Sequence, residues 1–143
     1  MAVFFHGSFG MNRDRMAGVL KSALKDPTAK DGTLANPFGY GAPFGARYRA
    51  WLRWSGLTNG ELPVRLTPLG EIVWKNHKRL STTITQWFLH HALTGDPNGA
   101  KDWHCFATEF LPGRSRFTKR DLMTGLMKKL SSHDKNPSAP TAR

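Results

Sequence analysis

The segment from Asn36 to Trp74 constrains the fold of this 143-residue chain more than any other part of it. It begins with a turn rich in glycine and proline and continues through residues 43–55, where aromatic residues recur at helical spacing. A polar turn and alternating apolar residues over 62–66 follow, and Thr67 is then placed to cap a helix whose first residue is proline. A helix, a short extended piece and a capped second helix, in that order, are typical of a winged helix-turn-helix.

Apolar residues at helical spacing predict further helices on both sides of this segment. One helix opens at Asn12 and stops at Asp26-Pro27, after which residues 28–33 read as a polar linker. Later helices are expected to start at Ser81 or Thr82, to span 103–110, and to follow a capping box of Thr118 with Asp121. The expected fold is therefore mainly α, a winged helix-turn-helix core with one small β ribbon and additional C-terminal helices. Residues 1–130 are expected to form one domain, and the polar tail 131–143 is expected to be disordered.

The charge of the chain is strongly positive and clustered. There are 21 Lys and Arg residues against 10 Asp and Glu residues, a net charge of +11. Residues 41–79 hold seven basic residues against two acidic ones, and residues 112–129 hold six against one, so each segment carries a net charge of +5. Clustered positive charge of this size favours a polyanionic partner, although it is also compatible with an acidic protein partner or with a solvated basic surface.

The helix over 43–55 is the expected recognition helix. Its aromatic residues share one face that can pack inward, while Arg49 and Arg53 lie roughly opposite and Arg47 lies on the flank. Arginine can make bidentate bonds to guanine or phosphate, and Arg65 is placed to contact the backbone as a wing residue would. An equally simple interpretation is that these arginines form a solvated helix face.

The second basic segment, 114–120, precedes and enters the last predicted helix, where positive charge opposes the helix dipole. A bound anion such as a phosphate would explain this placement, and a flexible basic loop is the alternative. The candidate nucleic-acid-binding residues are Arg47, Arg49, Arg53, Arg65, Lys75, Arg114, Arg116, Lys119 and Arg120.

No motif for catalysis, metal binding or a cofactor is present in the sequence. His90 and His91 are adjacent, which points them apart on a helix, and His104 adjoins the single cysteine, Cys105, so the spacings of zinc sites are absent. We expect His91 and His104 to be core or groove residues and Glu109 to pack with an arginine partner. No nucleophile elbow, phosphate loop or carboxylate pair appears, so we expect no enzyme activity, no metal and no cofactor.

The sequence contains no segment typical of membrane insertion or secretion. There is no apolar stretch of membrane-spanning length and no basic-then-apolar order of a signal peptide, so we expect a cytoplasmic protein without membrane association.

Several strings of the sequence are distinctive in combination. They are Phe5-His6-Gly7-Ser8-Phe9, Asn36-Pro37-Phe38-Gly39-Tyr40, Ala42-Pro43-Phe44, Tyr48-Arg49-Ala50-Trp51-Leu52, Leu66-Thr67-Pro68-Leu69-Gly70-Glu71, Thr85-Gln86-Trp87-Phe88-Leu89-His90, Trp103 to Pro112 and Phe117-Thr118-Lys119-Arg120-Asp121-Leu122. In these strings the chain resembles a family of bacterial proteins described only as a domain of unknown function. Members of that family are winged-helix-like proteins encoded in defence islands, often beside phosphoadenosine-phosphosulfate-reductase-like genes linked to DNA phosphorothioation. They are usually about twice as long as this chain, so the resemblance implies a short version or an accessory subunit.

Charge, pattern and resemblance together predict a non-catalytic nucleic-acid-binding protein. The expected function is recognition of duplex DNA in a DNA-modification or anti-phage defence system, together with other protein subunits. The alternative is a basic subunit of a larger nucleoprotein effector complex that contacts RNA or a displaced single strand. A metal-dependent nuclease is a third hypothesis.

Overall fold

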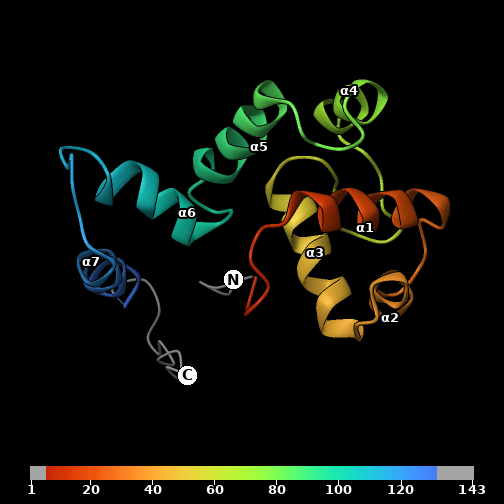
Figure 1. The fold of residues 1–143 in the computed structure, drawn as a ribbon, viewed down its shortest axis with the longest axis horizontal. Coiled ribbons are helices and arrows are strands. Elements are labelled where there is room, and N and C mark those ends of the chain that lie inside the picture. Colours follow the sequence, from red (N-terminus) through yellow and green to blue (C-terminus); the bar gives the residue numbers. More distant parts are fainter. Residues whose placement is uncertain (1–5, 132–143) are drawn as a thin grey trace. The chain divides into compact units, whose positions relative to one another are not determined.

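A computed structural model describes residues 6–131, and this part of the chain is mainly helical (Figure 1). The predicted tail, apart from Ser131, lies outside the described residues. The chain forms two compact units, residues 1–93 and 94–143, which we describe separately. The elements are α1 (Arg13–Lys25), α2 (Asp31–Ala35), the 3-10 helix η1 (Asn36–Phe38), α3 (Ala42–Trp54), α4 (Pro68–Asn76), α5 (Thr83–Gly95), α6 (Lys101–Cys105), the π-helical continuation η2 (Phe106–Phe110) and α7 (Lys119–Ser131).

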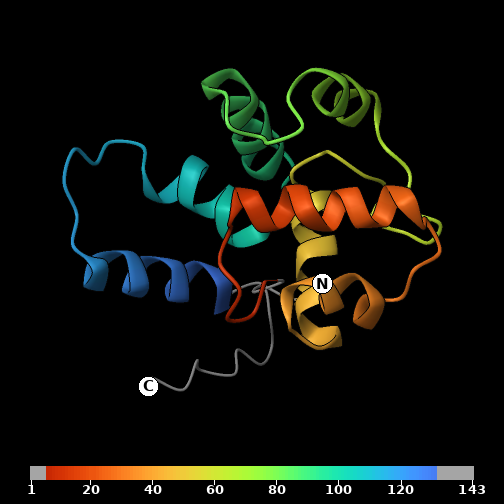
Figure 2. The same ribbon diagram turned by 45° about the vertical axis from the view of Figure 1, so that its right-hand side comes forward.

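The core of the first unit is built around α3, on which both α1 and α2 pack (Figures 1 and 2). The predicted inward face of α3 is confirmed, because Phe44, Tyr48, Trp51 and Leu52 are each at most 1% exposed. The segment before α1 covers the same face. Its carbonyls accept hydrogen bonds from buried side chains, with Trp51 Nε1 donating to the carbonyl of Phe9 at 2.9 Å. Aromatic burial of this extent is a large contribution to the stability of a small unit.

Helix ends follow the local signals of the sequence. Asn12 caps α1 by accepting a hydrogen bond from the backbone N–H of Arg15 at 3.0 Å, and Thr67 caps α4 by accepting from Gly70 at 3.0 Å. Gly56 follows α3 with a φ of +76°, which is the left-handed conformation that commonly ends a helix. These predictions are confirmed because each depends on residues only a few positions apart.

Two local predictions need correction. The linker expected over 28–33 gives way to α2 from Asp31 onward, because Leu34 and Ala35 are buried against α3. A five-residue helix is unstable alone, so tertiary packing stabilises it where local pattern did not predict it. The β ribbon expected near 62–66 is present, in the described residues, only as a single antiparallel bridge between Thr58 and Leu66. Within that turn the backbone N–H of Val64 donates a hydrogen bond to the carbonyl of Pro27 at 2.8 Å. The backbone of Val64 is therefore bonded to the segment that follows α1 and not to a neighbouring strand.

In the second unit, α6, η2 and α7 pack on one another. Three phenylalanine rings meet there, with Phe117 edge-on to Phe110 at a centroid distance of 5.2 Å and close to Phe106 as well. Helix α7 passes Phe110 at Gly125, where a Cβ would lie 2.7 Å from the ring. This aromatic group positions the basic loop between η2 and α7.

Candidate nucleic-acid interface

Arg49 does not lie on an open helix face, so the expected outward position is wrong. Its Nε is 3.0 Å from Oδ1 of Asp31, and its terminal NH₂ donates a hydrogen bond to Oδ2 at 3.2 Å. The side chains of Arg49 and Asp31 are only 23% and 26% exposed. The reason is that α2 packs on this side of α3 and brings a carboxylate to the guanidinium. Arg49 therefore joins two helices of the core.

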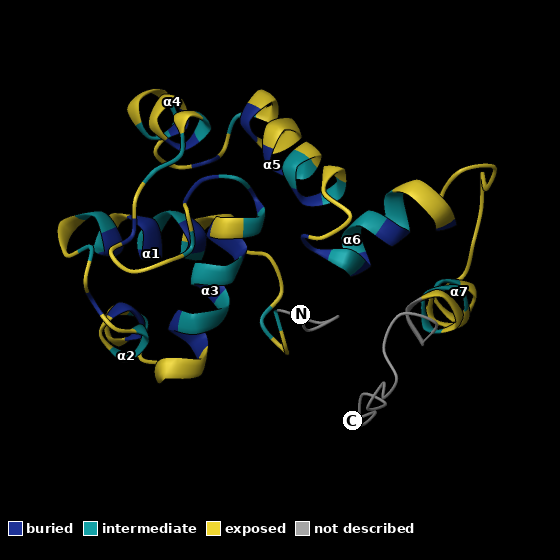
Figure 3. Cartoon of the chain, turned by 180° about the vertical axis from the view of Figure 1, so that it is seen from behind, coloured by how far each residue is buried: buried dark blue, intermediate teal, exposed yellow. Residues whose placement is uncertain are grey.

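The rest of α3 confirms that this helix belongs to the core. None of residues 44–52 is exposed (Figure 3). Arg47 is half-buried, with Nε 3.3 Å from the position that a Cβ would take at Gly7. Of the three arginines of α3, only Arg53, near the end, is exposed. Its guanidinium lies 4.6 Å from the ring centroid of Trp54, and its alkyl chain covers Gly60. A helix that reads DNA needs an exposed face along its length, and α3 has none.

Exposed cations instead lie in the turn before α4, on α4 and directly after it. Arg65 is exposed in the turn before α4, where Asn59 binds both backbone groups of Arg65 at 3.0 Å. Lys75, near the end of α4, is exposed as well. These two candidates are therefore placed where a ligand can reach them.

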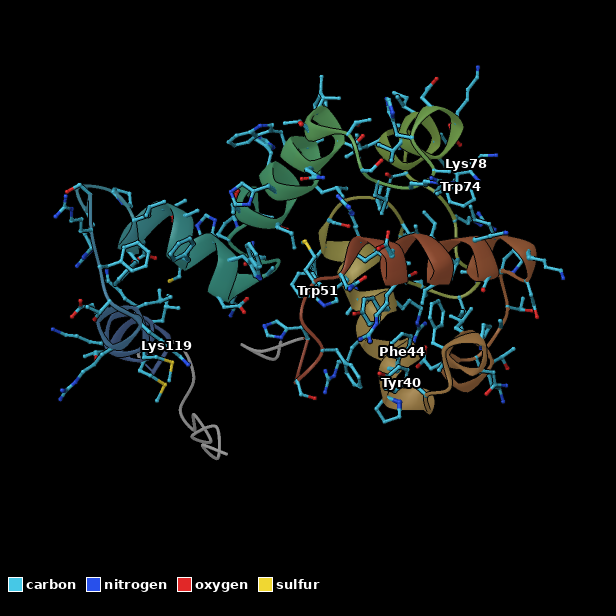
Figure 4. All side chains as sticks on the ribbon, viewed as in Figure 1. Tyr40, Phe44, Trp51, Trp74, Lys78 and Lys119 are labelled. Carbon is cyan, nitrogen blue, oxygen red and sulfur yellow. The ribbon has the colours of Figure 1, made fainter. Side chains whose placement is uncertain are left out.

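Two neighbouring cations, Lys78 and Arg79, are also exposed, although the sequence pattern did not single them out. Lys78 Nζ lies 5.7 Å from the ring centroid of Trp74 (Figure 4). A signal for them exists in the sequence, because residues 72–95 contain no Asp or Glu. We call Lys75, Lys78 and Arg79 the α4–α5 cations.

Helix α5 exposes its most apolar side. Its buried side is made by Thr85, Leu89 and Leu93, whereas Trp87 is 68% exposed and Phe88 is 51% exposed. Figure 3 shows that α5 carries both buried and exposed residues along its length. His91 is exposed too, so the core position expected for it is wrong, whereas the alternative groove position stays a prediction. The cause is that the neighbours of α5 in the first unit cover the Leu89 side; Ala92, for example, lies 3.2 Å from the position of a Cβ at Gly56.

An open hollow of about 390 Å³ runs along this exposed side of α5, lined by Thr83, Gln86, Trp87 and His90. The rings of Trp87 and His90 meet edge to face, with their centroids 6.2 Å apart. The Gln86 side chain donates a hydrogen bond to the carbonyl of Ser81 at 3.2 Å. The hollow therefore combines one large aromatic face with polar groups.

In the second unit the basic loop is partly engaged by the protein itself. Arg114 lies over the ring of Phe110 at 4.5 Å and donates to the Phe110 carbonyl. Arg116, Lys119 and Arg120 are exposed.

The N-terminus of α7 already holds an anion, the carboxylate of Asp121. This carboxylate accepts hydrogen bonds from the backbone N–H and the hydroxyl of Thr118, at 2.8 and 2.7 Å. These bonds lower the pKa of Asp121 below its usual value, and the charge of Arg114 lowers it further. The position proposed for a bound phosphate at this helix start is thus occupied by a side chain of the protein.

Cys105 and His104 are both engaged in local contacts. Burial raises the pKa of the Cys105 thiol to about 11, and the hydrogen bond that the thiol donates to Glu109, at 3.3 Å, adds to this effect. Glu109 pairs with Lys129 at 2.7 Å, and the expected pairing of Glu109 with an arginine stays a prediction. The His104 ring nitrogen Nδ1 lies 2.6 Å from the carbonyl oxygen of Thr94. A thiol that stays protonated is a poor nucleophile and a poor metal ligand.

No group of three or more His, Cys, Asp or Glu side chains within residues 6–131 is arranged to hold a metal ion. None of the helices in the same range is long and apolar enough to cross a membrane. In comparisons with known proteins, no family model, curated protein or solved structure matches this chain. The arrangement of cations and aromatic side chains is therefore the basis on which function can be argued.

Proposed function

We propose that this protein binds nucleic acid and does not catalyse a reaction. The observation that carries the proposal is the uncompensated charge of the α4–α5 cations. All three are exposed, no ion pair joins them to another described residue, and residues 72–95 contain no acidic side chain. Unpaired surface cations attract the phosphate backbone and release its counterions on binding.

We retain a winged-helix arrangement as part of this proposal, with different roles for its helices. In it, α3 is the core helix, the turn bridged by Thr58 and Leu66 is the wing, and α4 and α5 form the helix-turn-helix pair. Helix α5 is then the helix presented to the ligand, Arg65 contacts phosphates from the wing, and Arg53 contacts them from the end of α3. The exposure of α5 and the burial of α3 support this assignment.

Duplex DNA in a DNA-modification or defence system is the ligand and setting that the family resemblance supports, with other protein subunits as partners. In the second unit, Arg116, Lys119 and Arg120 supply further exposed charge for a phosphate backbone. A second candidate is a subunit of a nucleoprotein complex that contacts RNA or a displaced strand. The exposed aromatic side of α5 favours it, because bases stack on such side chains when they are unpaired.

Binding of a labelled mixed-sequence duplex, measured by fluorescence anisotropy over a range of salt concentrations, tests the proposal. The variant replaces Lys75, Lys78 and Arg79 with glutamine. We expect weaker binding and a salt dependence whose slope falls by up to about 2.7, since each phosphate contact to a duplex contributes about 0.9.

The control variant replaces Lys21, Lys25 and Lys30 with glutamine, which removes the same charge from α1 and the start of α2. We expect its salt slope to match that of the unmodified protein. Equal slopes for both variants would contradict the assignment of the surface. Failure of the unmodified protein to bind any duplex or single strand at low salt would refute the function, and cleavage of the probe with Mg²⁺ would refute its non-catalytic nature.

A further inference from the structure

Trp87 is the most exposed large apolar side chain in the described part of the first unit, and it lies on the same side of α5 as Ile84 and Phe88. A tryptophan that is 68% exposed keeps most of one ring face in water, which is unfavourable unless a ligand covers it. The edge-to-face contact with His90 orients the indole, so this face has a defined direction.

The chemistry around Trp87 limits what can cover it. The hollow that Trp87 shares with Thr83, Gln86 and His90 combines one large aromatic ring with hydrogen-bonding side chains. Its volume, about 390 Å³, is within the range of small-molecule sites, about 300–1,000 Å³. A flat ring with polar edges fits such a hollow better than an aliphatic side chain does.

The positive charge of this part of the chain further limits which kinds of ligand can occupy the hollow. The α4–α5 cations precede the hollow in the chain, and no acidic residue lies anywhere between 72 and 95. A second copy of this chain, which carries a net charge of +11, would place like charges against one another. A duplex carries phosphates, but its base faces are hidden within the stack. The ligand that offers both phosphates and free aromatic faces is a single strand.

We propose that α5 is a stacking platform for unpaired bases of a single-stranded nucleic acid. Trp87 and Phe88 contact base faces, Thr83, Gln86 and His90 face base edges, and the α4–α5 cations contact the phosphates. This inference depends on the proposed function, nucleic-acid binding, and for the α5 surface it favours the second candidate ligand, a single strand, over duplex DNA.

The test uses the full chain, a labelled oligothymidylate and a probe with the same backbone but abasic sites. Trp87→Ala should weaken oligothymidylate binding roughly 5- to 150-fold, the loss typical of one stacked base, without changing the salt slope. Trp87→Phe should retain most of the affinity. The abasic probe should bind the unmodified protein and Trp87→Ala equally, because it has no base to stack.

Further variants distinguish a loss of base stacking from a loss of folding and from a loss of charge. Met11→Ala removes another exposed large apolar side chain, just before α1 and outside the proposed binding surface, and should leave binding unchanged. The glutamine variant of the α4–α5 cations should lower the salt slope for the single strand by up to about 2.1, at about 0.7 for each phosphate contact. Circular dichroism of each variant verifies that its helices are intact.

The outcomes distinguish this inference from the function on which it depends. If Trp87→Ala binds oligothymidylate as tightly as the unmodified protein while loss of the α4–α5 cations weakens binding, the platform is refuted and nucleic-acid binding stands. If Trp87→Ala instead converts a dimer to a monomer in sedimentation and leaves strand affinity unchanged, the face is a protein contact and the platform is again refuted. Absence of binding to both probes and to duplex refutes both proposals.

Discussion

Replacing Gly45 with alanine should destabilise the protein, although alanine is the better helix former. Gly45 lies on α3 where the backbone of α2 crosses it. A Cβ at this position would lie 2.0 Å from the carbonyl oxygen of Asp31 and 2.7 Å from its carbonyl carbon. Non-bonded heavy atoms prefer separations of about 3.5 Å, so α2 would have to move by about 1.5 Å.

The size of the stability loss in Gly45→Ala can be estimated from the contacts that the movement of α2 would disturb. Overpacking of a core costs about 1–3 kcal/mol, and Leu34 and Ala35 of α2 would lose part of their burial. The ion pair between Asp31 and Arg49, one turn beyond Gly45, would lengthen, which costs roughly another 1 kcal/mol for a half-buried pair. The higher helix propensity of alanine, compared with glycine, offsets about 1 kcal/mol of this cost. The expected net loss is about 2 kcal/mol, or a melting temperature lower by about 8 °C.

Urea unfolding followed by far-ultraviolet circular dichroism measures this loss. Gly32→Ala on α2 is the matched control, because its new Cβ would have Ala42 as its nearest neighbour at 4.0 Å, an ordinary contact. We expect the control to be as stable as the unmodified protein or slightly more stable. If Gly45→Ala also unfolds at the unmodified midpoint or above it, α2 does not approach α3 as described and the reasoning is wrong.

The same displacement predicts coupling between Gly45 and Arg49. Once Gly45→Ala has moved α2, Arg49→Ala should cost less than it does alone, because the ion pair is already weakened. Full additivity of the two losses in unfolding free energy would show that the helix position and the ion pair are independent.

Two further predictions concern the second unit. Thr118→Ala should cost about 1 kcal/mol through loss of a helix cap and should raise the pKa of Asp121, whose carboxylate loses the hydrogen bond from the Thr118 hydroxyl but keeps the one from the Thr118 backbone N–H. Because the pKa of Asp121 is lowered in the folded state, the contribution of its carboxylate to stability exists above about pH 4 and is lost as pH falls through the folded pKa. The difference in unfolding free energy between the unmodified protein and Thr118→Ala should therefore shrink in acid. A difference that stays constant with pH would contradict this. Cys105, with a pKa of about 11, should react with iodoacetamide at pH 8 at least tenfold more slowly than a free cysteine peptide, and Glu109→Gln should speed the reaction by lowering that pKa. A peptide-like rate in the unmodified protein would show that the thiol is neither buried nor hydrogen-bonded.

Signals carried by neighbouring residues were predictable from the sequence. The caps at Asn12, Thr67 and Thr118 and the helix end at Gly56 are all present, because a cap depends on groups within three residues of one another. The mainly helical fold and the buried aromatic face of α3 follow from apolar spacing in the same way. Winged-helix topology, nucleic-acid binding and the defence setting stay predictions.

The tertiary structure decided which side of each helix meets water. The sequence of α3 puts Arg49 opposite the aromatic face, but α2, a helix too short to be predicted, covers it and supplies Asp31. The sequence of α5 has apolar residues on two sides, so periodicity alone does not identify the inner one. Packing buries Leu89 and leaves Trp87 in water, since burial is set by neighbours distant in the chain. The sequence by itself therefore determined the helices, their caps and the positive charge, whereas only tertiary packing decided which of the cations and which of the aromatic side chains are exposed to solvent.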